Sequence, residues 1–301
     1  MKKYAVGVVG ATGMVGQRFV TLLERHPWFQ LTVVAASARS AGKPYEEAVG
    51  HRWAMPTPMP EEAKSLVVLD AQADKEKIAG AVDFIFCAVD MKKEEIRALE
   101  EAYAKLECPV VSNNSAHRWT PDVPMVIPEV NPEHLAVLEA QKARLGTKRG
   151  FIAVKSNCSI QSYAPALHPL RSYGLERVLV CTYQAISGAG KTFETWPEIV
   201  DNVVPYIGGE EEKSEQEPLK VWGKVEKGQI VRPVDRITVA GSFPELLQKV
   251  QAVGKNLTFS FPGTSRYGAP DVLIESLNVA GSSASPCPSS IYNCGSSSLT
   301  T

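Results

Sequence analysis

Cys158 is the residue of this sequence whose surroundings best suit covalent chemistry. It follows Asn157 and directly precedes a helix-like segment, residues 160–174. The partial positive charge of a helix N-terminus favours thiolate near neutral pH, and thiolate is the nucleophilic form. A cysteine at such a place is more often a packing residue, but Gln161 lies three residues on and a Ser-Gly-Ala-Gly run, 187–190, lies downstream. We therefore predict that Cys158 is a nucleophile.

A glycine-rich loop near the N-terminus is the second candidate site. An apolar run of strand length, residues 4–10, leads into it, and a helical pattern, residues 17–26, follows it. In such a unit Gly10 permits a tight turn, Gly13 lets the backbone approach a diphosphate, and Gly16 lets helix and strand pack closely. We predict a dinucleotide-binding loop; the alternative is a glycine turn without a ligand. The predicted cofactor contacts of this loop are Gly10, Thr12, Gly13, Met14, Val15 and Gly16.

The end of the second predicted strand, residues 31–36, discriminates between the two nicotinamide cofactors. NAD-binding proteins usually carry an acidic residue there, which accepts hydrogen bonds from the ribose hydroxyls. This chain carries Ser37, Arg39 and Ser40 instead, and no acidic residue before Glu46. Hydroxyls and a guanidinium suit a 2′-phosphate, so we predict NADP rather than NAD; the alternative is that Arg39 is a solvated loop charge.

A nucleophilic thiol together with NADP implies a definite reaction. The thiolate adds to an aldehyde, and the thiohemiacetal gives a hydride to the nicotinamide. The resulting thioester is then transferred to water or to phosphate. The sequence thus predicts an aldehyde dehydrogenase whose nucleophile is Cys158.

Strands and helices alternate along the first 155 residues, and these elements must position both sites. The apolar runs lack polar alternation, which is typical of a parallel sheet buried on both faces. We predict an α/β fold: a Rossmann-type dinucleotide-binding domain over residues 1–155, and a second, α+β domain for catalysis and dimerisation that starts within residues 156–231. The expected strands are residues 4–10, 31–36, 66–69, 83–89, 109–112, 151–154 and 178–186; the expected helices include 91–106 and 131–146; and residues 210–227 are an exposed polar stretch.

Composition and charge exclude several classes of protein. The chain has 301 residues, of which 22% are charged, and its formal net charge of −1 gives no field that nucleic acid or an anionic membrane could exploit. Six cysteines form no CxxC pair and no His/Cys metal spacing, so neither a disulfide framework nor a metal site is expected. The first apolar run is too short for a signal peptide or a membrane span, so we expect a cytoplasmic protein.

Five motifs, taken in order, resemble one enzyme family. They are GATGMVG (10–16), SNNSAHRW (112–119), SNCSIQ (156–161), QAISGAG (184–190) and EEEKSEQE (210–217). As a set they closely resemble aspartate-semialdehyde dehydrogenase, particularly its archaeal and fungal branch, over about residues 1–231. The resemblance implies NADPH-dependent reduction of 4-phospho-L-aspartate to L-aspartate 4-semialdehyde, on the route to lysine, methionine and threonine. It also implies a homodimer or homotetramer.

The resemblance further implies roles for single residues. Cys158 matches the acyl-thioester nucleophile, and Gln161 matches the residue that positions the substrate beside it. Arg118 and Lys213 match two phosphate contacts, and Glu210 matches the carboxylate that receives the substrate amino group. Such roles suit a doubly charged acyl phosphate that carries a free amine. The predicted cofactor contacts outside the glycine loop are Ser37, Arg39, Ser40, Cys87, Ser187 and Gly188.

The final seventy residues do not continue the resemblance. The family carries a segment like R-V-P-V-x-D-G-H, whose arginine binds the substrate carboxylate and whose histidine is the general acid/base. The most similar segment of this chain is residues 231–238, in which Arg232 is the candidate for binding the substrate carboxylate. No histidine follows His168. Residues 232–301 contain 12 serines, and the last thirty residues have one charged side chain, Glu275. We expect either a divergent folded region or a frame-shifted, mis-spliced or disordered tail, and we favour the second.

Two other functions stay open. An N-acetyl-gamma-glutamyl-phosphate reductase shares the architecture and the cysteine, although its substrate has no free amine for an acidic motif to bind. A dinucleotide-binding protein without catalysis would follow from the missing acid/base histidine. Of the histidines present, His117 beside Arg118 is the one expected near a substrate, and we do not assign it as a replacement base.

Overall fold

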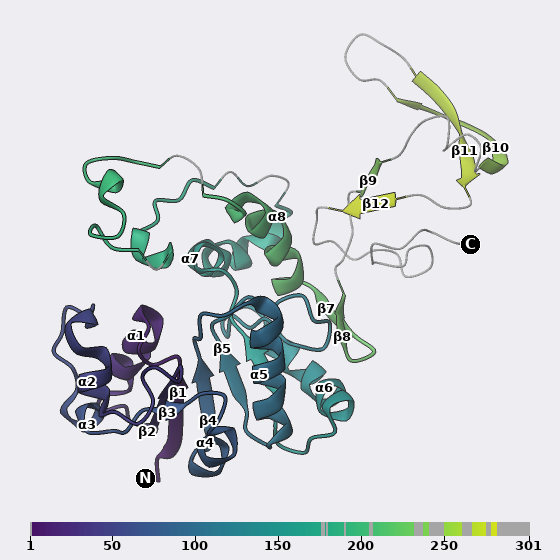
Figure 1. The fold of residues 1–301 in the computed structure, drawn as a ribbon. Coiled ribbons are helices and arrows are strands. Elements are labelled where there is room, and N and C mark those ends of the chain that lie inside the picture. Colours follow the sequence, from purple (N-terminus) through teal and green to yellow (C-terminus); the bar gives the residue numbers. More distant parts are fainter. Residues whose placement is uncertain are drawn as a thin grey trace. The chain divides into compact units, whose positions relative to one another are not determined.

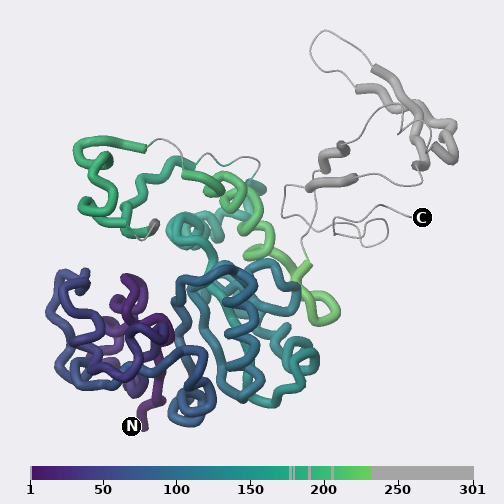
Figure 2. The backbone as a smooth tube through the Cα atoms, viewed as in Figure 1, coloured from purple at the N-terminus to yellow at the C-terminus, as the bar shows by residue number. Residues whose placement is uncertain are grey.

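The computed structural model describes residues 2–175, 178, 180–189, 191–204 and 207–231, together with the backbone of four strands between 237 and 281. The chain divides into two units, Met1–Ile230 and Val231–Thr301. Figure 1 shows their helices and strands, and Figure 2 traces the same backbone as a tube.

A six-stranded parallel sheet forms the centre of the first unit (Figure 1). Its strand order is β3-β2-β1-β4-β5-β6, so the chain reverses direction across the sheet after β3 and continues on the other side of β1. Parallel pairing in this order is that of a Rossmann-type domain, and it confirms the predicted α/β class. The strands are β1 (Tyr4–Val9), β2 (Phe29–Ala36), β3 (Leu69–Asp70), β4 (Phe84–Cys87), β5 (Val110–Ser112) and β6 (Ile152–Val154).

Helices connect these strands. The predicted helix 91–106 is confirmed as α5, which packs against β5 and β6. The predicted helix 131–146 is a 3-10 turn followed by a short α-helix, which ends at Gly146. Asn131 does not cap it, because its side chain accepts from the Ile127 N–H and donates to the Met125 carbonyl. The elements are α1 (Met14–Leu23), α2 (Tyr45–Val49), η1 (Gly50–Arg52), α3 (Glu61–Lys64), α4 (Lys75–Ala81), α5 (Lys93–Lys105), η2 (Pro132–Val137) and α6 (Leu138–Leu145).

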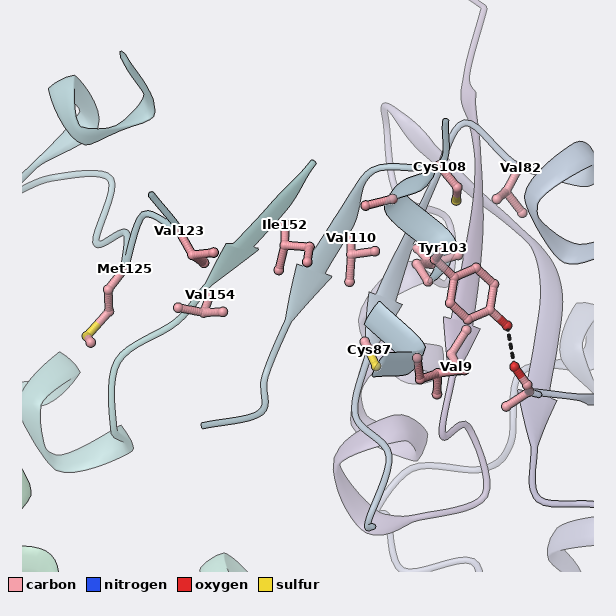
Figure 3. Packing of buried hydrophobic residues seen from close by; sticks show 14 of the residues in the cluster. Val9, Val82, Cys87, Tyr103, Cys108, Val110, Val123, Met125, Ile152 and Val154 are labelled. Atoms are coloured by element: carbon pink, nitrogen blue, oxygen red, sulfur yellow. Dashed lines mark hydrogen bonds between the residues drawn. The ribbon is translucent and has the colours of Figure 1, made fainter. Parts of the chain in front are cut away.

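The sheet is buried on both faces, as the uninterrupted apolar runs predicted. Along β2, Val33 belongs to one buried cluster and Val34 to the other. Figure 3 shows the larger cluster, in which side chains from β1, β5 and β6 meet Tyr103 of α5. The Tyr103 hydroxyl donates to the Ala71 carbonyl at 2.8 Å, so this buried polar atom has a partner. The clusters fix the position of the strand ends, where the candidate sites lie.

The first unit continues with two helices and short turns beyond β6. These elements are α7 (Cys158–Leu167), η3 (His168–Tyr173), η4 (Ile186–Ala189), η5 (Pro197–Ile199), α8 (Glu210–Val221), β7 (Lys224–Glu226) and β8 (Gln229–Val231). The prediction of a strand over residues 178–186 is wrong for the residues that the structure describes there. Val178, Val180 and Tyr183 are exposed, and the described residues offer no neighbouring strand with which this apolar segment could pair. An extended segment without such a partner has no ladder of hydrogen bonds to hold it.

The described residues of the second unit form two antiparallel strand pairs. β9 (Ile237–Ala240) pairs with β12 (Asn278–Gly281), and β10 (Val250–Ser260) pairs with β11 (Tyr267–Ile274). Regular strands therefore occur within residues 232–301, for which the sequence analysis left a divergent fold or a frame-shifted tail open. Arg232 and the serine-rich residues 282–301 lie outside the described residues.

Over the part of the chain that the structure describes, no helix is long and apolar enough to cross a membrane. The same residues bring together no group of His, Cys, Asp and Glu side chains that could hold a metal ion.

Candidate active site

The glycine loop joins β1 to α1, as predicted. Gly10 has φ of +91°, which residues with a side chain rarely adopt, and a Cβ on Gly16 would overlap the carbonyl oxygen of Gly10. A Cβ on Gly13, by contrast, would have its nearest neighbour at 3.5 Å, so the protein itself leaves room there. Gly13 is also the N-cap of α1, and no side chain caps that helix. The N–H groups of its first turn can therefore face an anion such as a diphosphate.

The predicted 2′-phosphate contacts follow β2 at the same edge of the sheet. The Gly10 N–H donates to the Ala35 carbonyl at 2.8 Å, which places the end of β2 beside the glycine loop. Ser37 and Arg39 are exposed, whereas Ser40 is buried. Of the three predicted residues, the first two can therefore present their side chains to a ligand.

Cys87 ends β4 next to β1, but its side chain points into the core (Figure 3). The side chain is fully buried, and burial raises the pKa of its thiol, with a further contribution from the charge of Glu100. Asn114 donates to the sulfur at 3.5 Å and to the Glu100 carboxylate at 3.1 Å. The predicted contact between Cys87 and a cofactor can therefore come only from the backbone of this residue.

Cys158 is the first residue of α7, and it is exposed. The side chain of Asn157 caps the helix, since its oxygen accepts from the Ser159 N–H at 2.8 Å. Gln161 lies one turn later and is partly exposed. The predicted nucleophile thus lies at the N-terminus of a helix, and the predicted positioning residue follows it in the same helix.

The side chain of Glu210, at the start of α8, lies against the start of α7. Its carboxylate accepts from Lys213 at 2.7 Å, from Asn157 at 3.1 Å, from Ser159 at 3.3 Å and from Gln184 at 2.9 Å. Burial acts to raise the pKa of Glu210, but the hydrogen bonds from Lys213 and Gln184 outweigh it, and the pKa is lowered. A carboxylate with its paired ammonium therefore lies against Asn157 and Ser159, the residues on either side of Cys158 in the chain.

Gln184 is a residue of this cluster that the sequence analysis missed. It belongs to the QAISGAG motif, in which only Ser187 and Gly188 were predicted to contact a ligand. Those two residues are exposed in η4, and within the described chain neither is bonded to another predicted site residue. The amide of Gln184 donates to both Ser159 and Glu210 at 2.9 Å. The sequence did contain one sign of this role: Gln184 is a polar residue within the apolar segment 178–186 that was predicted to be a strand.

Arg118 lies in a buried network, not on an open surface. Its guanidinium donates to Glu217 at 2.9 Å and to the Lys155 carbonyl at 3.0 Å. The second carboxylate oxygen of Glu217 accepts from the Asn157 N–H at 2.6 Å. The predicted phosphate-binding arginine is thus connected, through one carboxylate, to the residue before the nucleophile.

The prediction that residues 210–227 form an exposed stretch is wrong for part of α8. Glu217 and Lys220 are buried, at 1% and 4% exposure. The Lys220 ammonium donates to the carbonyls of Arg118, Thr120 and Val123 at 2.7–2.9 Å. Buried charges are stable where partners satisfy them, and here the segment 118–123 supplies these partners. The spacing from Glu210 to Glu217, two helical turns on one face, was the signal that indicated a second inward-facing acid.

His117 is unsuited to act as a base on the surface of the site. Its side chain is 2% exposed, Nδ1 lies 3.0 Å from the Thr120 hydroxyl, and burial lowers its pKa. The decision not to assign His117 as a replacement base is consistent with this position. Arg232, the remaining substrate-binding candidate, lies outside the described residues.

Two family models match the first unit. The NAD binding domain of semialdehyde dehydrogenases matches residues 5–138, and their dimerisation domain matches residues 167–241. The aspartate-semialdehyde dehydrogenase of Methanothermobacter thermautotrophicus is 45% identical over 229 residues, which are 76% of this chain and 63% of that protein. The first three quarters of this chain are thus similar to aspartate-semialdehyde dehydrogenases and match both semialdehyde dehydrogenase domain models.

Further aspartate-semialdehyde dehydrogenases show the same similarity. The aspartate-semialdehyde dehydrogenase of Saccharomyces cerevisiae is 40% identical over 226 residues, 73% of this chain and 60% of that protein. The crystal structure of the Candida albicans aspartate-semialdehyde dehydrogenase with NADP is 36% identical, with a TM-score of 0.64, over 77% of this chain and 64% of that one. The chain spans 60–63% of the length of such relatives.

A third family model matches the C-terminal part. Residues 219–281 match the C-terminal domain of PmbA/TldA metallopeptidases. The match overlaps the end of the semialdehyde dehydrogenase match and covers all four strands of the second unit. The departure from aspartate-semialdehyde dehydrogenase near residue 232 thus coincides with similarity to a different family.

Proposed function

We propose that residues 1–231 form the NADP-binding and thiol-bearing part of an aspartate-semialdehyde dehydrogenase. The reaction is the reductive dephosphorylation of 4-phospho-L-aspartate to L-aspartate 4-semialdehyde, a step toward lysine, methionine and threonine. The observation that carries the proposal is the cluster at the start of α7. There the exposed Cys158 lies between Asn157 and Ser159, which both donate to the carboxylate of the Glu210–Lys213 pair. A relative whose crystal structure contains NADP supports the choice of cofactor.

The residues of this cluster have complementary tasks in that reaction. Cys158 forms the acyl thioester, and Gln161 orients the substrate beside it. Glu210 receives the substrate ammonium, and the hydrogen bonds from Lys213 and Gln184 that lower its pKa stabilise its carboxylate form. Lys213 and Arg118 bind the phosphate. NADPH, bound at the glycine loop, Ser37 and Arg39, supplies the hydride.

Low turnover is expected of this chain, because the acid/base histidine that the resemblance implies is absent after His168. A placed general acid or base contributes about 10²–10⁴-fold to rate. The test is steady-state oxidation of aspartate semialdehyde with NADP and phosphate, on purified chain of confirmed mass, with Cys158→Ser as the control. We expect weak or undetectable turnover that this control abolishes. A turnover within about tenfold of other family members would contradict the assignment of a missing base.

Two alternatives are separated by the choice of ligand. The N-acetyl-gamma-glutamyl-phosphate reductase alternative predicts turnover of the acetylated substrate, but the Glu210 carboxylate is better explained by a substrate with a free amine. The catalytically dead alternative predicts NADP binding with no substrate-dependent turnover of either compound. Side-by-side assays with both substrates distinguish these outcomes.

We further propose that the chain forms a homodimer or homotetramer, with no nucleic-acid or membrane partner, and acts in the cytoplasm. The match of residues 167–241 to a dimerisation domain supports self-association. Sedimentation velocity of the purified chain measures the number of subunits, and a monomer at micromolar concentration would contradict this proposal.

For the C-terminal part we propose a segment of a second family joined in frame. Frame-shifted codons give residues without relation to any family, whereas residues 219–281 match a family model and contain regular strands. Sequencing the coding DNA across codons 225–245 in three frames tests this origin. Recovery of an R-V-P-V…H sequence in another frame would support a frame shift instead.

A further inference from the structure

Three cationic side chains surround the start of α7, and two of them are neutralised. Arg118 pairs with Glu217 at 2.9 Å, and Lys213 pairs with Glu210 at 2.7 Å. In each pair the carboxylate also accepts further hydrogen bonds from the α7 cap region. An incoming anion must therefore compete with a carboxylate at both predicted phosphate contacts. The third cation, Lys155, is not paired with a carboxylate within the described part of the chain.

Lys155 follows β6 and precedes the nucleophile by three residues. It is half-buried, and its Nζ donates to the Ser156 carbonyl at 3.1 Å. Within the described part of the chain Lys155 forms no ion pair. Glu217 attracts it, but the two oxygens of that carboxylate already accept from Arg118 and from Asn157.

The charges around Lys155 make it sensitive to an anion. Burial, followed by the charge of Arg118, lowers the pKa of Lys155, whereas negative charge at Cys158 and at Glu217 acts in the opposite direction. The hydrogen bond from the Lys155 Nζ to the Ser156 carbonyl holds the ammonium beside the residues that lead into Cys158. Its backbone is held as well, because the Lys155 carbonyl accepts from Arg118 at 3.0 Å.

We propose that Lys155 is a further anion-binding residue of the active site, which receives the phosphate group of the acyl phosphate or free phosphate beside Cys158. The inference rests on the proposed function for the identity of the substrate. The net charge of each ion pair, Arg118–Glu217 and Lys213–Glu210, is zero. Lys155 therefore supplies the excess positive charge that a phosphate dianion requires. Lys213 and Arg118 then provide orientation.

Alkylation of the full chain with two reagents tests this proposal without requiring turnover. Iodoacetate and iodoacetamide both form an S–CH₂ bond to thiolate and release iodide, but only iodoacetate is an anion. The ratio of their rates at Cys158, mapped by peptide mass spectrometry, cancels any change in the thiolate fraction. Lys155→Met should lower this ratio by about fivefold at low salt, as expected for one charge near a partly solvated anion.

Further variants distinguish the effect of the charge of Lys155 from the effect of its shape. Lys155→Arg should keep the ratio within about twofold. The half-buried Lys142 of α6 provides the matched control, and Lys142→Met should leave the ratio unchanged. Inorganic phosphate should slow iodoacetamide labelling of the original chain, and Lys155→Met should need several times more phosphate for the same protection. If Lys155→Met does not fold, Lys155→Gln replaces it.

The possible results separate this proposal from the proposed function. An unchanged ratio in Lys155→Met, or an equal fall in Lys155→Arg, would overturn the role of Lys155 even if the chain turns over substrate. A lowered ratio in Lys155→Met that Lys155→Arg restores supports the role of Lys155 even if the chain does not turn over substrate.

Discussion

Arg118 donates to Glu217 at 2.9 Å across 99 residues of sequence, and both side chains are buried. The same carboxylate accepts from the N–H of Asn157, the residue before the nucleophile. One side chain of α8 therefore holds both a predicted substrate contact and the loop that presents Cys158. Stability and site geometry are coupled at this residue.

Glu217→Gln should destabilise the fold strongly. Removal of one partner leaves the Arg118 charge buried without a counter-charge, at a cost of about 3–5 kcal/mol. Urea unfolding measures the change, and Glu139→Gln is the matched control, because its pair with Lys142 is exposed and should contribute no more than about 1 kcal/mol. Similar losses of unfolding free energy in both variants would show that the buried pair stabilises the fold no more than the pair on the surface does.

Substitution by alanine should affect stability differently at Gly13 and at Gly16. A Cβ on Gly16 would overlap the Gly10 carbonyl, so Gly16→Ala should lower both stability and NADP affinity. Gly13 has space for a Cβ, with its nearest neighbour at 3.5 Å. Gly13→Ala should therefore keep the melting temperature and weaken NADP binding alone, as measured by fluorescence titration. An unchanged affinity would show that no diphosphate approaches Gly13.

Arg39→Ala should reduce the preference for NADP. The residue is exposed after β2, where a 2′-phosphate would lie, and loss of a charge-assisted contact costs about 1–3 kcal/mol. Titration of both cofactors should show weaker NADP binding and unchanged NAD binding. A chain that prefers NAD by tenfold or more before mutation would contradict the cofactor assignment.

Cys158 should be the first cysteine alkylated by limiting iodoacetamide at neutral pH. Cys87 and Cys108 are buried, and burial raises the pKa of both thiols, whereas Cys158 and Cys181 are exposed. Only Cys158 of these begins a helix. Peptide mapping after partial reaction gives the order. Labelling dominated by the tail cysteines, 287 and 294, would mean that exposure outweighs activation by a helix terminus.

His134 should make the protein less stable below neutral pH. It lies between the Asn131 amide and the Gly223 carbonyl, each at 3.0 Å, and burial lowers its pKa. The unfolded chain therefore binds the proton more readily, so the stability is fully present above about pH 6.5 and falls as the pH drops through that value. Urea midpoints at pH 7.5 and 5.0 should differ less in His134→Gln than in the original chain. An equal difference would assign the effect to other groups.

Local pattern was sufficient to predict the strand, glycine turn and helix at the N-terminal end of the chain. The run of residues 4–10, the glycine spacing and the helical period that follows determine a strand, a turn and a helix between neighbouring parts of the chain. Gly10 and Gly16 are required by backbone geometry within this unit, so the sequence carries the reason for both. Cys158 at a helix start was equally local, because Asn157 caps the helix through its immediate neighbours.

The surroundings of Cys158 were decided by tertiary structure alone. Charged side chains are usually solvated, so the sequence by itself indicated an exposed acidic stretch in which Glu217 had no separate role. Burial of that carboxylate becomes favourable only where Arg118 and the Asn157 N–H satisfy it, and chain neighbours supply neither bond. For the same reason sequence spacing could not show that Lys213 forms an ion pair with Glu210, whereas Lys155 forms none among the described residues. A periodic pattern records which face of an element is buried, whereas the partner that a charge meets there depends on the fold.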